Sequence, residues 1–223
     1  LTTNGNTDPL FSITGGTHSI ATNPGTAVGR IFGRTSATAL DTETDALGTQ
    51  LTLGTDEPVI NQAGVALEMT GATVTGAQRA LILDSALIDA SFPLLSLKAA
   101  SAFTTALDAI NLQNKAKLAS VGPIVKLDAS TLTVTSGAAF NLSGGSLLKV
   151  TGDLISLTNG STLSILNGPV LSLTDGTVGS VVNISGALLA FGTSSGNTVN
   201  ITNSLCAAAC STMPDCAPGA ARP

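Results

Sequence analysis

The stretch Val125-Lys-Leu-Asp-Ala-Ser-Thr-Leu-Thr-Val-Thr135 contains the structural unit of this chain. Apolar and polar residues alternate on both sides of a short break at residues 128–130. Alternation with a period of two is typical of half-buried strands, and small polar residues between such segments favour a tight bend. The stretch therefore predicts a strand, a bend and a second strand.

Similar stretches recur along the chain, at residues 65–74, 81–88, 125–134, 148–157 and 171–178. A second motif recurs in phase with them, with spacings of 30, 23, 19 and 17 residues between Asn111, Asn141, Ser164, Asn183 and Asn200. Strand starts at Pro93, Pro123, Ser146, Pro169 and Ala187 are spaced by 30, 23, 23 and 18 residues. Phased repeats of this kind indicate stacked structural units, here coils with three strands and loops of variable length.

The predicted fold is an all-β, single-domain parallel β-solenoid. Each coil places alternate Val, Leu, Ile and Phe side chains inward, and stacking of coils supplies the core. We expect the solenoid at residues 58–204, preceded at 1–57 by a cap, a pairing arm or irregular first coils, and followed at 205–223 by a Cys-containing cap or tail. An amphipathic helix over residues 97–118, where Ala, Leu and Lys are abundant, is the competing interpretation.

Composition narrows the classes of function. The net charge is −5 with an isoelectric point near 4.6, which argues against a nucleic-acid partner. The aromatic residues are six Phe, with no Trp and no Tyr, so a sugar-stacking cleft is not expected. No apolar run reaches the length of a transmembrane helix. The first residue is Leu1, and removal of a signal peptide from a secreted or cell-surface protein is the simplest explanation.

Three cysteines, Cys206, Cys210 and Cys216, lie close together near the end of the sequence. In an exported protein this clustering predicts one local disulfide that fastens the end of the solenoid, with the third thiol free or joined to another molecule. A zinc site would need a fourth ligand, and the single histidine, His18, is far away in the sequence. We expect no metal and no other cofactor.

The sequence contains no motif for catalysis. His18 lies in a turn-like stretch, and neither a nucleophile elbow nor a Walker loop is present. The alternating carboxylates of Asp41-Thr-Glu43-Thr-Asp45 could bind Ca²⁺, but the pattern of an EF-hand loop is missing. Asp84 and Asp89 form the one close acidic pair within the repeats, and turn capping explains such residues more simply than glycoside hydrolysis. The sequence therefore predicts a protein that is not an enzyme.

Two surface features have alternative interpretations. Asn141, Asn183 and Asn200 lie in sequons and could accept glycans, or they could stack in an outward ladder of amides, which we favour. The Thr-x-Thr pattern of residues 131–135 is typical of solenoid faces that bind ice. Residues 154–157 and 177–179, taken as its neighbours in adjacent coils, do not continue the pattern, so no regular threonine array is expected.

The repeats, such as residues 125–137, resemble the parallel β-helices of bacterial filamentous-haemagglutinin and autotransporter-type surface proteins. The resemblance covers roughly residues 58–204 and rests on pattern. It implies secretion and a structural or adhesive role. We expect a protomer that assembles with itself, through the ends of the solenoid, into a surface filament or sheath. The alternatives are a monomeric adhesin for a surface or glycan ligand, a pectate-lyase-like enzyme and an ice-binding protein.

Overall fold

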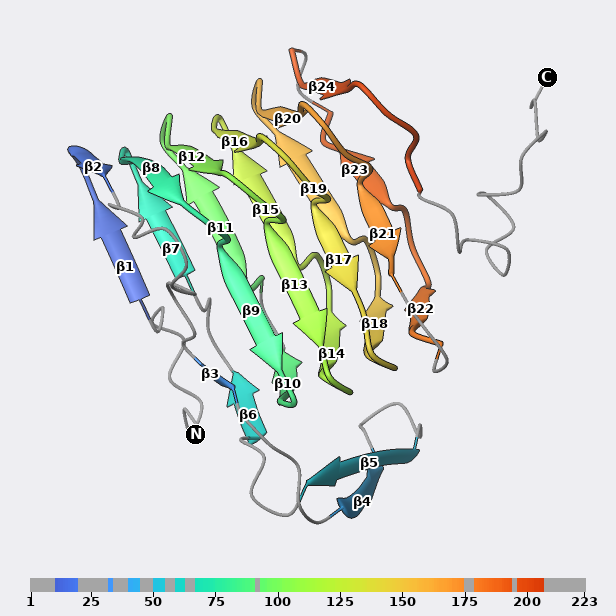
Figure 1. The fold of residues 1–223 in the computed structure, drawn as a ribbon. Helices are drawn as coiled ribbons and strands as arrows, with labels where there is room; N and C mark the ends of the chain where they lie inside the picture. The colour runs from blue at the N-terminus through green and yellow to red at the C-terminus, as the bar shows by residue number, and fades with distance from the viewer. Residues whose placement is uncertain are drawn as a thin grey trace, which may run out of the picture.

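The computed structural model describes residues 11–19, 32–33, 40–44, 50–54, 59–62, 67–90, 93–174, 179–193 and 196–206. These residues confirm the predicted architecture, because they form an all-β parallel solenoid of about four turns. Figure 1 shows the turns stacked side by side from the N-terminal to the C-terminal end of the coil. Among the described residues, no helix is long and apolar enough to cross a membrane.

Four parallel sheets run along the stack, and we number them I to IV in the order in which the chain visits them. Sheet I contains β1 (Phe11–Thr14), β7 (Leu67–Thr70), β11 (Leu95–Lys98), β15 (Val125–Asp128), β19 (Ile155–Thr158) and β23 (Leu189–Phe191). Sheet II contains β2 (Thr17–Ser19), β8 (Thr73–Ala77), β12 (Ala102–Thr105), β16 (Thr131–Val134), β20 (Thr162–Ile165) and β24 (Thr198–Ile201). Sheet III contains β3 (Phe32–Gly33), β9 (Leu81–Asp84), β13 (Ile110–Gln113), β17 (Phe140–Leu142) and β21 (Leu171–Leu173). Sheet IV contains β6 (Val59–Gln62), β10 (Leu87–Ala90), β14 (Lys117–Val121), β18 (Leu147–Thr151) and β22 (Val181–Ile184).

The turns are longer than the sequence repeats suggested. Equivalent positions in sheet I are 67, 95, 125, 155 and 189, so successive turns take 28, 30, 30 and 34 residues. The prediction of three strands per coil is therefore wrong. Pro93, Ser146 and Pro169, which were aligned as equivalent, lead into sheets I, IV and III. Strands of all four sheets share one apolar alternation, so strands of different sheets resemble each other as closely as strands of the same sheet.

The core runs through the middle of the coil. Leu127 in β15, Leu132 in β16 and Phe140 in β17 point inward and are fully buried. No single turn can bury its own apolar side chains, so each turn is stabilised by its neighbours. Removal of this apolar surface from water contributes about 25 cal/mol per Å² to folding.

Several corners are built on non-glycine residues with left-handed backbone. Ala99, Ala100 and Ala129 have φ values of 56°, 60° and 49°. This conformation is unfavourable for residues with a Cβ, but the next turn supplies hydrogen bonds: Ala100 N–H donates to the Ala129 carbonyl (2.9 Å). The predicted alternative of a helix over residues 97–118 is wrong, because this Ala-rich segment forms a corner followed by β12 and β13.

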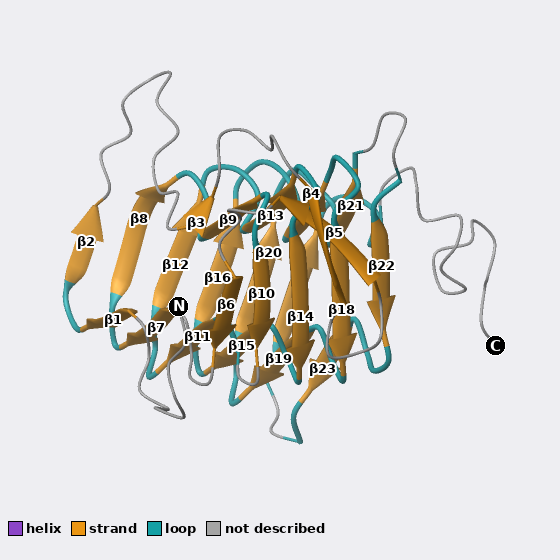
Figure 2. Ribbon diagram, turned by 90° about the horizontal axis from the view of Figure 1, so that it is seen from below, coloured by secondary structure: helices purple, strands orange, loops and turns teal. Residues whose placement is uncertain are grey.

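The N-terminal segment takes part in the fold in two ways. Strands β1, β2 and β3 pair in parallel with β7, β8 and β9, so the sheets begin before the expected boundary at residue 58. Strands β4 (Leu40–Thr44) and β5 (Gln50–Gly54) form an antiparallel hairpin. Figure 2 shows this hairpin crossing the outer face of sheet IV, in front of β14 and β18. At the other end, a parallel bridge between Leu171 and Cys206 continues sheet III beyond β21.

Candidate functional site

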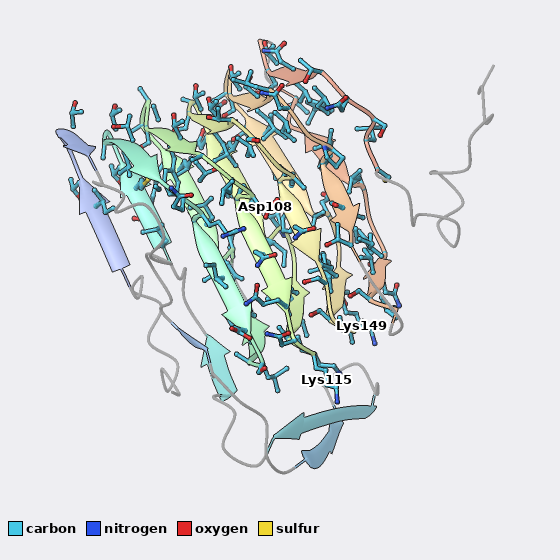
Figure 3. All side chains as sticks on the ribbon, in the orientation of Figure 1. Asp108, Lys115 and Lys149 are labelled. Atoms are coloured by element: carbon cyan, nitrogen blue, oxygen red, sulfur yellow. The ribbon has the colours of Figure 1, made fainter. Side chains whose placement is uncertain are left out.

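The outer faces of the four sheets are the places where this solenoid can meet a partner, and they differ in chemistry. On sheet IV, the outward residues Leu87, Ala119 and Leu147 are only 6, 4 and 9% exposed. The β4–β5 hairpin lies on the side of the stack formed by sheet IV (Figures 1 and 2). Figure 3 places Lys115 and Lys149 on the side of the stack that faces this hairpin. This part of the outer face of sheet IV is therefore buried, whereas Val121 and Val181 on the same sheet are exposed.

The outer face of sheet III carries a chain of hydrogen-bonded polar side chains that spans four turns, which we call the amide ladder. Thr174 Oγ1 donates to Asn141 Oδ1 (3.2 Å), and Asn141 Nδ2 donates to Asn111 Oδ1 (2.9 Å). Asn111 Nδ2 donates to Gln113 Oε1 (2.8 Å), and Gln113 Nε2 donates to Asp84 Oδ2 (2.9 Å). Every donor in the series points toward the carboxylate of Asp84.

Asp84 is the acceptor at the end of this ladder. Its side chain is 2% exposed, and Oδ1 accepts a further hydrogen bond from Asn114 Nδ2 (2.7 Å). Both carboxylate oxygens are thus bonded to amides, as a buried anion requires. Asp89, the acid paired with it in the sequence analysis, belongs to β10 of sheet IV, whereas Asp84 belongs to β9 of sheet III. The fold therefore places the two acids on different sheets.

The outer face of sheet I carries charge. Lys98 Nζ lies 2.8 Å from Glu68 Oε2 across adjacent turns, and Lys126 is exposed on the next turn. Asp128 stands at the end of β15 and accepts a hydrogen bond from Thr158 Oγ1 (3.3 Å). Charged pairs of this kind on a solvated face contribute little to stability, but they distinguish sheet I from the uncharged face of sheet II.

The corner between sheets II and III is fastened by Asp108. Its carboxylate lies 3.3 Å from Arg79 Nε of the preceding turn and accepts a hydrogen bond from Ala138 N–H of the following turn (2.9 Å). Figure 3 shows Asp108 within the stack, between β12 and β13. One carboxylate thus joins three successive turns, which is a structural role.

The corner between sheets I and II contains a ladder of buried serines. Ser101 N–H donates to Ser130 Oγ (3.1 Å), and Ser130 N–H donates to Ser161 Oγ (3.2 Å). Ser161 N–H donates to Asn197 Oδ1 (2.9 Å), so an asparagine ends the series. The three serines are 0 to 3% exposed. Sequence analysis missed this ladder, although its signal is a small or polar residue immediately before each strand of sheet II.

We expect Ser130→Ala to destabilise the solenoid, because Ser101 N–H loses its acceptor while it stays buried. Leaving a buried donor without a partner costs about 1–3 kcal/mol. Chemical denaturation followed by circular dichroism measures this change. Ser136→Ala, at an exposed position of the same turn, is the control and should change stability by less than about 0.5 kcal/mol. Equal midpoints for the two variants would contradict a stabilising role for the ladder.

The outer face of sheet II carries small uncharged residues in register. Thr131 pairs with Thr162, and Thr133 pairs with Ser164 on the next turn. The neighbours assumed for residues 131–135 were wrong, because residues 154–157 lead into β19 of sheet I and do not lie beside β16. The expected absence of a strictly regular threonine array still holds for the described strands, since β12 carries Ala102 and β24 carries Asn200 at these positions. The true neighbours of β16 in sheet II are β12 and β20. Each of these strands begins directly after a corner serine.

The asparagines predicted to form one ladder lie on three different sheets. Asn141 is in sheet III and stacks on Asn111, Asn183 is in sheet IV opposite Lys149, and Asn200 is in sheet II opposite Ser164. The predicted single ladder is therefore wrong, for the same reason as the predicted coil length. Asn183 and Asn200 are exposed, and their glycosylation stays a prediction.

The remaining candidates lie partly outside the described residues. Cys206 pairs in a bridge with Leu171, but Cys210 and Cys216 are not among the described residues, so the disulfide stays a prediction. The side chains of His18 and of residues 41–44 are likewise not described. Within the described part of the chain, no group of three or more His, Cys, Asp or Glu side chains could hold a metal ion.

Comparison with known proteins identifies no relative of this chain. No protein family, no curated protein and no solved structure matches the chain.

Proposed function

We propose that this protein is a non-catalytic extracellular structural protein whose copies join end to end into a filament. The observation that carries the proposal is the pairing at the two ends of the stack. Among the described residues, β1, β2, β3 and β6 pair with strands on one side only, and so do β22, β23 and β24. Edge strands are templates for pairing with another chain.

The two ends of the stack have matching chemistry. Leu189 and Phe191 of β23 occupy the same register positions in sheet I as Phe11 and Ile13 of β1. In sheet IV, the sequence Val181-Val-Asn183 of β22 stands in register with Val59-Ile-Asn61 of β6. A second copy stacked in the same register would place apolar residues on apolar residues at the inward positions. Such a heterologous contact propagates without closing.

At the C-terminal end of sheet I, the edge strand β23 is apolar, and some of its backbone groups point along the stack, away from the preceding turn. Phe191 is 56% exposed, although the equivalent residue of the preceding turn, Leu157, is fully buried. The Leu188 carbonyl and the Gly192 N–H form hydrogen bonds with the preceding turn. Backbone groups of successive residues point to opposite sides of a parallel strand, so the N–H and C=O groups of Leu189 and Phe191 point toward the end of the stack. A following subunit would cover this apolar edge.

The resemblance of the repeats to filamentous-haemagglutinin and autotransporter-type proteins supports secretion and display at a cell surface. A monomeric adhesin is the alternative from the same resemblance, and it would have both ends capped. The two functions differ in one property, the state of association of the purified chain. Negative-stain electron microscopy with sedimentation over a concentration series distinguishes them, and reductant tests a contribution from cysteine cross-links.

We expect Phe191→Lys to suppress filaments, because a charge would enter the apolar contact between copies. The concentration needed for assembly should rise by about tenfold, the effect of about 1.4 kcal/mol of lost contact energy. Val121→Lys is the matched control: Val121 is 59% exposed, but β14 is paired on both sides within the stack. This control should assemble like the natural chain.

Sedimentation of the two variants at equal concentration checks the prediction, with melting curves to show that both are folded. Monomers of the natural chain at every concentration would overturn the filament and favour the adhesin. Equal loss of assembly in both variants would show that the lateral surface, and not the end, makes the contact.

A further inference from the structure

The outer face of sheet II is a two-dimensional array of small side chains, which we call the hydroxyl face. Its first row follows the strand register without interruption through Thr17, Thr73, Ala102, Thr131, Thr162 and Thr198. Its second row runs through Thr104, Thr133, Ser164 and Asn200. Each strand of the central turns therefore presents two residues of the array, separated by one inward residue.

The strands that carry the hydroxyl face are fixed by tightly packed residues on the inner side of sheet II. The inward residues between the two rows, Leu132 and Leu163, are fully buried, and Phe103 is 4% exposed. Thr131, Thr133 and Thr162 are half-buried because they stand side by side. Threonine is stiff about χ1, since it is branched at Cβ, so the positions of these side chains are set before any ligand arrives.

The hydroxyl groups of this face are available for a ligand. Elsewhere in the solenoid hydroxyls are used internally, as Ser130 Oγ donates to the Asp128 carbonyl (2.8 Å). By contrast, within the described residues the hydroxyls of Thr131, Thr133 and Thr162 make no hydrogen bond to the protein. An array of hydroxyls left to the solvent is unlike the amide ladder of sheet III, in which each amide bonds to the next.

The array has two fixed repeats. Adjacent strands lie about 4.8 Å apart, and alternate residues along a parallel strand are about 6.6 Å apart. Figures 1 and 2 show the strands of the stack running nearly parallel, so these repeats hold over several turns. A ligand that repeats on this scale, such as the ordered water layers of an ice crystal, can meet the face at several points at once. The ligand suited to such a face is a lattice and not a single molecule.

We propose that the hydroxyl face binds ice. The central rows contain no charged residue, which disfavours a mineral, a phospholipid surface or nucleic acid as the ligand. They contain no aromatic residue, which disfavours a polysaccharide bound by ring stacking. Threonine offers a hydroxyl that bonds to water and a methyl group around which water becomes ordered. The other faces are less suited: sheet I is charged, the amides of sheet III bond to one another, and the outward residues Leu87 and Leu147 of sheet IV are buried.

The test uses the natural chain and two tyrosine variants. Thr133→Tyr puts a ring in the middle of the array, and tyrosine is favourable in strands, so the fold should persist. Thr70→Tyr is the matched control, because Thr70 is a half-buried outward threonine on sheet I. Each protein is frozen slowly, its partition into the growing ice is measured, and crystal shape and thermal hysteresis are recorded in an osmometer.

We expect the natural chain and Thr70→Tyr to enter the ice and shape the crystals. The hysteresis of Thr133→Tyr should be about tenfold lower, because the ring separates the neighbouring hydroxyls from the ice surface. Exclusion of the natural chain from ice, at the level of serum albumin, would overturn the proposal, as would equal activity of the two variants. Binding to microcrystalline cellulose or chitin without binding to ice would assign the face to a polysaccharide instead. The outcome is independent of filament formation, which is measured separately by sedimentation.

Discussion

Gly168→Ala lowers the melting temperature by about 10 °C, in our expectation, while Gly179→Ala leaves it unchanged. A Cβ on Gly168 would lie 1.8 Å from the Gly137 carbonyl oxygen and 2.4 Å from its carbon. Both atoms belong to the backbone of the preceding turn, so no side-chain rotation can relieve the overlap. The two turns must separate at this corner, which costs about 3 kcal/mol, the upper end of the usual range for overpacking. Each kcal/mol lowers the melting temperature of a chain of this size by about 2–4 °C.

Gly179 provides the control for this prediction. A Cβ there meets no atom within 4 Å, and the residue does not have a positive φ. The substitution Gly179→Ala therefore tests the general effect of replacing a glycine without the contact between turns. Scanning calorimetry on the two variants measures the difference. Melting temperatures within 2 °C of each other would contradict close packing between the corners of successive turns.

Asp84→Ala is expected to destabilise the protein by about 3 kcal/mol, the second large effect. The substitution removes the acceptor of two amide donors, Gln113 Nε2 and Asn114 Nδ2. Hydrogen bonds to a charged group contribute about 1.5–3 kcal/mol each, and Asp84 accepts two of them from side chains. Asp84→Asn should lie between this variant and the natural chain, because one carbonyl oxygen replaces two carboxylate oxygens.

Thr174→Ala is the control at the other end of the ladder. Thr174 is exposed and donates to Asn141 at 3.2 Å, so its loss should cost less than about 0.5 kcal/mol. Urea denaturation of the three variants gives the comparison. A stability of Asp84→Ala equal to that of Thr174→Ala would show that water replaces the ladder without loss.

The sequence predicted the strands well and their arrangement only in part. In residues 125–134 the alternation identifies both strands and the bend, because each inward Val or Leu contacts a neighbouring turn. The assignment of strands to sheets could not be predicted, since Leu147 and Leu171 begin strands of the same pattern on different sheets. The helix interpretation was wrong because the helix propensity of Ala is a local property. The conformation of Ala100 depends instead on a hydrogen bond to the Ala129 carbonyl of the next turn.

The surface features were harder to predict for the same reason. The rows of the hydroxyl face become visible only when Thr131, Thr162 and Thr198 are aligned, which requires turns of about 30 residues. The amide ladder requires Asn111 and Asn141 to be neighbours, and that pair was indeed spaced by one turn. The placement of the β4–β5 hairpin beside sheet IV depends on the folded chain, and no local pattern in the sequence indicates it.

The serine ladder also bears on how this chain can change during evolution. Each corner serine accepts a hydrogen bond from the preceding turn, so the residue that one turn needs is encoded about 30 residues later. Duplication or deletion of a complete turn keeps the series intact, whereas loss of part of a turn leaves a buried N–H without an acceptor. Asn197 can then serve as the end of a series of any length. We expect descendants of this gene to differ by whole turns inserted before that asparagine.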